Sequence, residues 1–231
     1  MTLDRSGREL ADRHLRLGSS LASQGRISEA IGEYQTAIRL RPDWAEAHLC
    51  LGIAYRREGK LNDAIKECSS AIQLNPNLIE AHLNLAHVYR IQERFDDALT
   101  ELKRALEVDP ENALACYNMG VIYEKLKRLD DAVKMYQLSI KGMPYNAKAH
   151  ANLGAVYMRT DKLKDATTEL QIALKYDPTD HIAHYNLGVI YAKERNYKDA
   201  MEELQLTTKH KPDFLQARQL LEIVRRLYRG G

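Results

Sequence analysis

Four asparagines recur at intervals of 34 residues: Asn84, Asn118, Asn152 and Asn186. Asparagine is only a middling helix former, so helix propensity does not explain its repeated use. Its side-chain amide carries both a donor and an acceptor, the two kinds of group that an extended peptide presents along its backbone. A row of such amides is therefore expected to bind a peptide main chain with little regard for its side chains. The alternative is that each amide bonds to a neighbouring helix or to water.

Side chains that could do covalent chemistry are present but are not arranged for it. No GxxxxGK[ST], GxSxG, HExxH or paired-cysteine motif occurs. His181 and His184 lie near Asp177 and Asp180, but this conceivable metal pair lacks a third fixed ligand. Five of the eight histidines occupy the same place in a repeated pattern and are expected to be structural: His14, His48, His82, His150 and His184. We therefore expect no enzyme activity, no cofactor and no metal.

The three cysteines, Cys50, Cys68 and Cys116, are odd in number and show no CxxC spacing. A disulfide framework is not expected, and a reducing compartment fits better. Cys50 takes the place of an asparagine in the repeated row and is expected to be an exposed thiol. The N-terminus lacks the apolar stretch of a secretory signal. These features predict a cytoplasmic protein.

The composition excludes two classes of partner. The 34 basic and 32 acidic residues leave a net charge of +2, which is too small to favour nucleic acid or an anionic membrane surface. No window of about 18 apolar residues exists, so no membrane insertion is expected. With 45% hydrophobic and 29% charged residues, the composition is normal for a folded protein.

The elements that position these side chains follow from the prolines. All six lie 34 residues apart: Pro42, Pro76, Pro110, Pro144, Pro178 and Pro212. A fixed period of about 20 to 50 residues indicates stacked structural units. Placing the proline near the end of each unit gives six units: 11–44, 45–78, 79–112, 113–146, 147–180 and 181–214. Residues 1–10 form an N-terminal extension, of which 1–8 are expected to fray, and 215–231 form a capping helix and tail.

Each unit contains two apolar stripes of helical period, so it is predicted to be a pair of helices. The first stripe carries Gly18, Gly52, Gly120, Gly154 and Gly188, and the second carries an alanine in every unit. Glycine within a helix costs about 1 kcal/mol relative to alanine, so its repetition needs a reason. Small residues on both stripes would let the two helices approach closely. The second helices are expected to start with N-caps near Ser28, Asn62, Asp96 and Asp130.

This pattern resembles the tetratricopeptide repeat family over residues 11–214, without insertion or deletion. The resemblance implies an all-α protein, an α-solenoid with a right-handed superhelix of six helix pairs plus the C-terminal capping helix. It also implies a concave groove lined by the first helix of each pair. The asparagine row is similar to the asparagine ladder in the tetratricopeptide segment of O-linked N-acetylglucosamine transferases. Only that binding element carries over, because the enzyme's catalytic domain does not occur in these residues.

The resemblance places further side chains in the groove. Tyr117 and Tyr185 are aromatic anchors of the kind enriched at binding hot spots, and His87 lies beside the asparagine row. The alternative for the tyrosines is packing against the adjacent repeat. Basic residues occupy one recurring position, at Arg57, Lys125, Arg159 and Lys193. These either attract an acidic peptide or complement the negative end of the helix dipole.

One known ligand of the family is excluded. The two-carboxylate clamp of heat-shock co-chaperones needs a lysine and an asparagine where this chain has Leu83 and His87. It also needs a base where this chain has Asn152. A heat-shock C-terminus is therefore not expected to bind.

Together, these observations predict a non-enzymatic adaptor that holds an extended segment of a partner protein in its groove. Two alternatives remain open. One is a self-assembling homo-oligomeric scaffold, in which the face of the first repeat carrying Leu15 and Leu21 packs on another copy. The other is a substrate-recruiting segment of a larger enzyme such as a glycosyltransferase.

Overall fold

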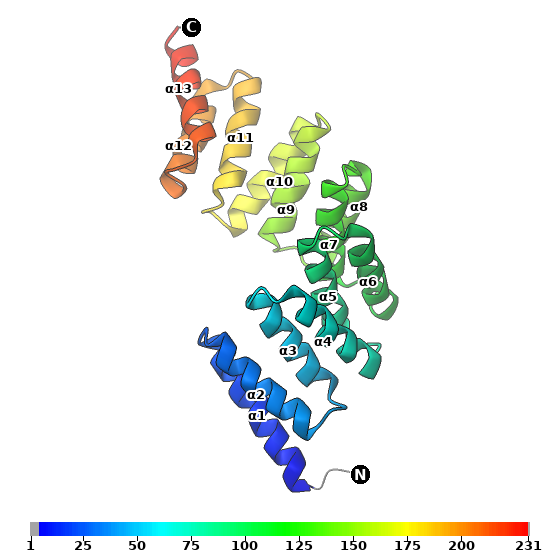
Figure 1. The fold of residues 1–231 in the computed structure, drawn as a ribbon. Helices are drawn as coiled ribbons and strands as arrows, with labels where there is room; N and C mark the ends of the chain where they lie inside the picture. Colours follow the sequence, from blue (N-terminus) through cyan, green and yellow to red (C-terminus); the bar gives the residue numbers. More distant parts are fainter. Residues whose placement is uncertain (1–4, 231) are drawn as a thin grey trace. The chain divides into compact units, whose positions relative to one another are not determined.

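The computed structural model describes residues 5–230, and within that range the regular structure is entirely helical. The helices are labelled in Figure 1. They are α1 (Arg5–Ser23), α2 (Ile27–Leu40), α3 (Ala45–Arg57), α4 (Leu61–Leu74), α5 (Ile79–Ile91), α6 (Phe95–Val108), α7 (Ala113–Lys125), α8 (Leu129–Gly142), α9 (Ala147–Arg159), α10 (Leu163–Tyr176), α11 (His181–Lys193), α12 (Tyr197–His210) and α13 (Leu215–Gly230). The chain divides into two compact units, Met1–Ala115 and Cys116–Gly231.

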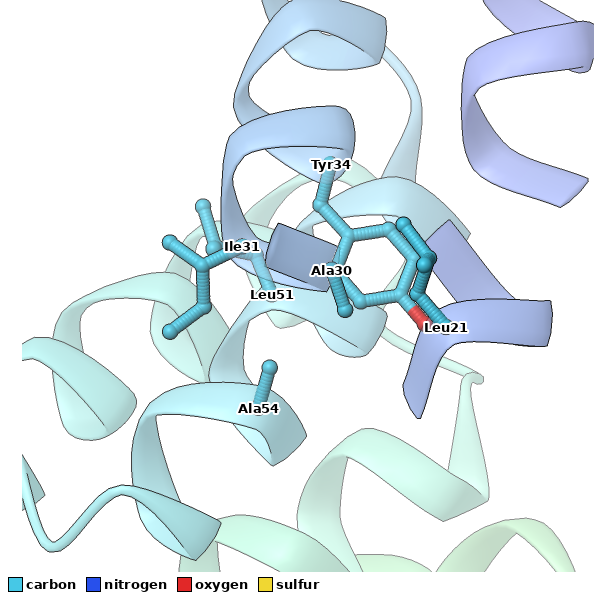
Figure 2. Close-up of a cluster of buried hydrophobic side chains, with 6 residues drawn as sticks. All are labelled: Leu21, Ala30, Ile31, Tyr34, Leu51 and Ala54. Carbon is cyan, nitrogen blue, oxygen red and sulfur yellow. The ribbon is translucent and has the colours of Figure 1, made fainter. Parts of the chain in front are cut away.

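In the first unit the helices pack as consecutive antiparallel pairs, α1 with α2, α3 with α4 and α5 with α6. Helices α2 and α4 also pack on the first helix of the next pair, α3 and α5. Figure 2 shows such a junction, where Leu21 of α1 and Tyr34 of α2 share a core with Leu51 of α3. Because each core takes residues from two successive pairs, a single pair does not bury its own apolar face.

The second unit repeats this arrangement. Helix α9 packs on α10 and α11 on α12, while α8, α10 and α12 each contact the helix that follows (Figure 1). Helix α13 covers the end of the unit by burying Ala217, Leu221 and Val224 in a cluster with Leu204 of α12. Beside this buried face α13 carries an exposed pair between Arg225 and Glu222.

The glycines of the first helices are places of close helix approach, as the sequence predicted. A Cβ at Gly52 would lie 2.7 Å from Cys68 Sγ and 3.2 Å from the Cys68 backbone nitrogen. A Cβ at Gly120 would lie 2.6 Å from Cε1 of Tyr136. The facing alanines of the second helices, such as Ala30 and Ala64, are fully buried. There is no room for a larger side chain on either helix.

The predicted N-caps are wrong. The second helices begin earlier than expected, with Arg26, Lys60, Arg94 and Arg128 in the N-cap position and no side-chain capping bond. The residues expected as caps fall inside the first turn. There the acidic side chains suit the positive end of the helix dipole. The acidic residue that follows the expected cap holds the N-cap arginine, as where Asp97 accepts a bond from Arg94 Nε at 2.7 Å.

Residues 5–8 are helical, so the expected fraying is wrong for them. They extend α1 without interruption, since glycine is the only weak helix former among them. Residues 1–4 lie outside the described part of the chain. Leu15 and Leu21 were expected on an open face, but Leu21 is buried and Leu15 packs against the same core.

In four repeats the repeated histidine joins the two helices and the preceding turn. In His48, His82, His150 and His184, Nδ1 lies 2.6–2.7 Å from a glutamate 19 residues later, on the second helix. In the same rings Nε2 lies 3.0–3.1 Å from the carbonyl oxygen of the proline six residues earlier. Each of these rings therefore links the second helix of its repeat to the turn that precedes the first helix. The predicted structural role of these histidines is confirmed.

We predict opposite effects of Gly52→Ala and Gly32→Ala. Both replace glycine within a helix of the first unit, so both gain up to about 1 kcal/mol of helix propensity. Gly32 has open space where a Cβ would be, so its variant should be stabilised. Gly52 faces Cys68 and backbone atoms that cannot move away, so overpacking of about 1–3 kcal/mol should outweigh the gain. Urea unfolding of the two variants measures the difference in their free energies of unfolding. Equal stabilisation would show that the helices leave room for a Cβ at Gly52.

Candidate functional site

Three asparagines of the predicted row lie in the second unit, Asn118 on α7, Asn152 on α9 and Asn186 on α11. All three are half-buried. The 34-residue period gives them the same position on successive first helices, and α9 contacts α11 directly. Among the described residues, neither Asn118 nor Asn186 makes a side-chain hydrogen bond to the protein. Their amides can therefore bond to a ligand or to water.

Asn152 differs because its amide is already in contact with tyrosines. Its Nδ2 lies 3.4 Å from Tyr117 Oη and 3.3 Å from Tyr136 Oη, both long for a hydrogen bond. The rings of Tyr117 and Tyr136 are 6.0 Å apart. For this residue the alternative of a bond to a neighbouring helix is observed, through weak contacts that leave the amide oxygen free to accept.

A carboxylate that the sequence analysis missed lies beside Asn152. Tyr136 Oη donates to Glu124 Oε2 at 3.1 Å, and Arg159 Nη1 donates to Glu124 Oε1 at 3.1 Å. Tyr136 is fully buried, and burial raises its pKa, so the hydroxyl remains a donor. Arg159 is thus engaged within the protein. The other two predicted bases of this unit, Lys125 and Lys193, are exposed in the last turns of α7 and α11.

Tyr185 is half-buried, and its ring lies 4.9 Å from that of Phe214. It also packs against the cluster formed by Leu204 and Leu221. The alternative of packing is therefore observed for part of this ring, which contributes to the junction between α11 and α13. Tyr117 is half-buried as well.

Asn84 belongs to the first unit, on α5. It is half-buried, and its Nδ2 donates to the backbone oxygen of Glu80 at 2.8 Å, one turn earlier in the same helix. Its donor group is therefore satisfied locally, whereas its side-chain oxygen can still accept. His87 lies one turn further along α5, and burial followed by the charges of Arg56 and Arg90 lowers its pKa to about 4. This imidazole is neutral near pH 7.

Cys50 and Arg57 line a hollow between α1 and α3 with a volume of about 220 Å³. Ser19, Ala22 and Tyr34 also line it. Cys50 is half-buried rather than exposed, and burial, then the charge of Glu46, raises the pKa of its thiol. Arg57 is exposed, and its Nη1 donates to the backbone oxygen of Ala22 at 3.2 Å. The sequence does contain a signal for this hollow. Ala22 is small, whereas the residue at the same position three repeats later is Glu124. The difference becomes visible only when the repeats are compared.

The histidine pair considered for metal binding has other partners. His184 contacts Glu203 and the Pro178 carbonyl, and the ring of His181 stacks edge-on against Phe214 at 5.9 Å. Across residues 5–230, no three or more His, Cys, Asp or Glu side chains come together as a metal-binding group. In the same range no helix combines the length and apolarity needed to span a bilayer.

Family models bear out the repeat pattern. A model described as "TPR repeat" matches residues 18–58, 52–90 and 86–127, and two described as "Tetratricopeptide repeat" match residues 115–144 and 151–213. The chain belongs to the tetratricopeptide repeat family, and its fold is an all-α solenoid of that type. A search of curated protein sequences gives no match.

Several solved structures share the fold. The structure of pilF from Pseudomonas aeruginosa is 15% identical with a TM-score of 0.84, covering 93% of this chain and 98% of its own. A crystal structure of MamA is 25% identical with a TM-score of 0.63, covering 70% of this chain and 94% of its own. YrrB, described as a TPR protein with an unusual peptide-binding site, is 22% identical with a TM-score of 0.65, covering 80% of this chain and 96% of its own.

Two histidines on α5 should give opposite pH dependences. The bond to Glu101 raises the pKa of His82, so its stabilising effect is complete below the unfolded value of about 6.5 and is lost as pH rises through the folded pKa. Burial lowers the pKa of His87 to about 4, so the fold loses stability as pH falls from about 6.5 towards that value.

The measurement is urea unfolding of His82→Gln and His87→Gln beside the unaltered protein, from about pH 4.5 to pH 9. The His82 variant should lose its stability deficit as the pH rises. The His87 variant should gain relative stability as the pH falls. Parallel curves for the two variants would contradict this assignment.

Proposed function

We propose that this chain is a non-enzymatic, cytoplasmic adaptor that holds an extended segment of a partner protein along the first helices of its repeats. The observation that carries the proposal is the row of Asn118, Asn152 and Asn186 on successive helices of one unit, where two of the amides make no side-chain hydrogen bond among the described residues. Each amide offers the donor and acceptor that an extended backbone needs.

The surroundings of this row support a protein ligand. Tyr117 adds a half-buried aromatic ring beside Asn152, and Val121 and Val189 add half-buried apolar side chains. Apolar surface with a few placed polar groups is typical of ligand sites. Lys125 and Lys193 are exposed in the last turns of α7 and α11, the helices that carry Asn118 and Asn186. They add positive charge to this part of the surface. The similarity to YrrB, described as having a peptide-binding site, is in keeping with such a role.

The test is a triple variant, Asn118→Ala, Asn152→Ala and Asn186→Ala, against a random peptide library from which binders of the unaltered protein have been selected. Each lost hydrogen bond is worth about 1 kcal/mol, so the selected peptides should bind tenfold to a hundredfold more weakly, as fluorescence anisotropy would measure. The matched control replaces Lys134, Thr168 and Glu202 by alanine, three exposed residues at one position of the second helices.

The control should bind as the unaltered protein does, and circular dichroism should show equal helicity for all three proteins. Unchanged binding by the asparagine variant would refute the row as the binding element. Equal losses in the variant and the control would point to a general effect on the fold.

Self-association is the second candidate function, and the uncovered side of α1 favours it. Leu10 and Leu17 are 44% and 48% exposed and lie two helical turns apart on one side. They replace Leu15 and Leu21 as the residues to test, because those two belong to the core. If α1 joins two copies, the mass measured by light scattering should rise with concentration, and Leu10→Gln with Leu17→Gln should abolish the rise. A constant monomer mass would exclude this function.

A further inference from the structure

The same arrangement of side chains occurs at two places in the chain, which lie three repeats apart in sequence. Tyr34 and Arg57 in the first unit correspond to Tyr136 and Arg159 in the second. The other repeats carry Cys68, Leu102, Leu170 and Leu204 where these two carry a tyrosine. A tyrosine hydroxyl combined with an arginine therefore occurs at these two places of the repeated pattern.

In the second unit this arrangement holds a carboxylate. The Glu124 side chain receives a bond from Tyr136 Oη on one oxygen and from Arg159 Nη1 on the other, each at 3.1 Å. A phenol and a guanidinium are both donors that favour an ionised carboxylate. The second unit thus shows a tyrosine and an arginine binding a carboxylate together.

In the first unit the residue that corresponds to Glu124 is Ala22, and the hollow of about 220 Å³ lies there. The two donors make poorer contacts. Tyr34 Oη is 3.4 Å from Ser19 Oγ, and Arg57 Nη1 donates to the Ala22 backbone oxygen at 3.2 Å. The Tyr34 ring is 4% exposed, so its hydroxyl is available only from within the hollow. Arg57 and Ser19 at the rim are exposed, which leaves the hollow accessible from solvent.

We propose that this hollow between α1 and α3 binds the carboxylate of a glutamate side chain from the partner segment, held by Tyr34 and Arg57. The proposal rests on the peptide-binding function above and adds a side-chain preference to it. The chemistry is that of Glu124 in the second unit, with the acid supplied by the ligand instead of by α7. It uses neither the lysine nor the asparagine of the two-carboxylate clamp, both of which this chain lacks.

Cys50 provides a reporter inside the hollow. It occupies the place of Asn152 and is half-buried, whereas Cys68 and Cys116 are buried. The experiment follows the alkylation of Cys50 by iodoacetamide, located by mass spectrometry, in the presence of a blocked Ala-Glu-Ala tripeptide. Its control is the same tripeptide with Gln in place of Glu. The glutamate peptide should slow alkylation saturably, with a dissociation constant roughly tenfold or more below that of the Gln peptide.

Two variants test the named donors. Arg57→Gln and Tyr34→Phe should each abolish the difference between the two peptides while Cys50 still reacts. Ala22→Glu should recreate the Glu124 arrangement, slow alkylation without any peptide and remove the peptide effect. Ala22→Gln is its matched control, because glutamine has the same size as glutamate without the charge. This variant should neither slow alkylation by itself nor remove the peptide effect. The pair Ala22→Glu and Ala22→Gln also keeps the test decisive if Tyr34→Phe weakens the fold.

Equal protection by the Glu and Gln peptides, or a full peptide effect in Ala22→Glu, would overturn the proposal. An Ala-Gln-Ala peptide with a free C-terminus that protects better than the blocked glutamate peptide would assign the hollow to a chain terminus and overturn the glutamate assignment. Failure of the peptide-binding function is distinguishable from these results. In that case the selected library peptides bind the asparagine variant as tightly as the unaltered protein, while the tripeptide still protects Cys50.

Discussion

The close approach of the two helices of each repeat determines where every other side chain lies. A glycine on the first helix leaves a bare stretch of backbone, and the residue 16 positions later on the second helix lies across it, as Tyr34 does at Gly18 and Tyr136 does at Gly120. Because the glycine has no side chain, the tyrosine ring lies close against the first helix, and its hydroxyl contacts a polar side chain of that helix. The Tyr136 hydroxyl reaches Glu124 in this way, and that of Tyr34 reaches Ser19. The residue at this packing position therefore also decides whether a hydroxyl is available to the polar side chains of the first helix.

A second constraint fixes the joints between repeats. Four of the repeated histidines lie between a glutamate of their own repeat and the proline carbonyl that closes the previous one, as His82 lies between Glu101 and Pro76. Because the ring contacts both the second helix and the preceding turn, it orients the turn as well as the two helices. The fourth repeat has Cys116 in place of the histidine. The sequence records the histidine–glutamate pairing as a constant separation of 19 residues.

The helix pairs, their order and their close contacts could be predicted from the sequence because the period is strict and glycine has few other reasons to recur within helices. The helix starts could not. Glu93, Lys127, Asp161 and Arg195 adopt positive φ values of 58–61° where other repeats have Gly25 and Gly59, so composition does not mark the turn. The asparagine row was predicted as one pattern, yet Asn84 bonds to its own helix and Asn152 contacts two tyrosines. These differences arise from neighbours on other helices, which a one-dimensional period does not contain.

Deviations from the repeat therefore carry more functional information than the repeat itself. Packing positions must repeat because every junction has the same geometry, so Ala30 and its counterparts say little about ligands. Positions at the edge of the packing can vary at less cost to the fold. Ala22, which is partly buried against the core of the first unit, and Glu124 occupy one such position within the same framework of tyrosine and arginine. The change of this single side chain separates an open hollow from a filled one. Because the framework is the same in both places, the contacts of Glu124 are the basis for expecting an acidic group at the open hollow.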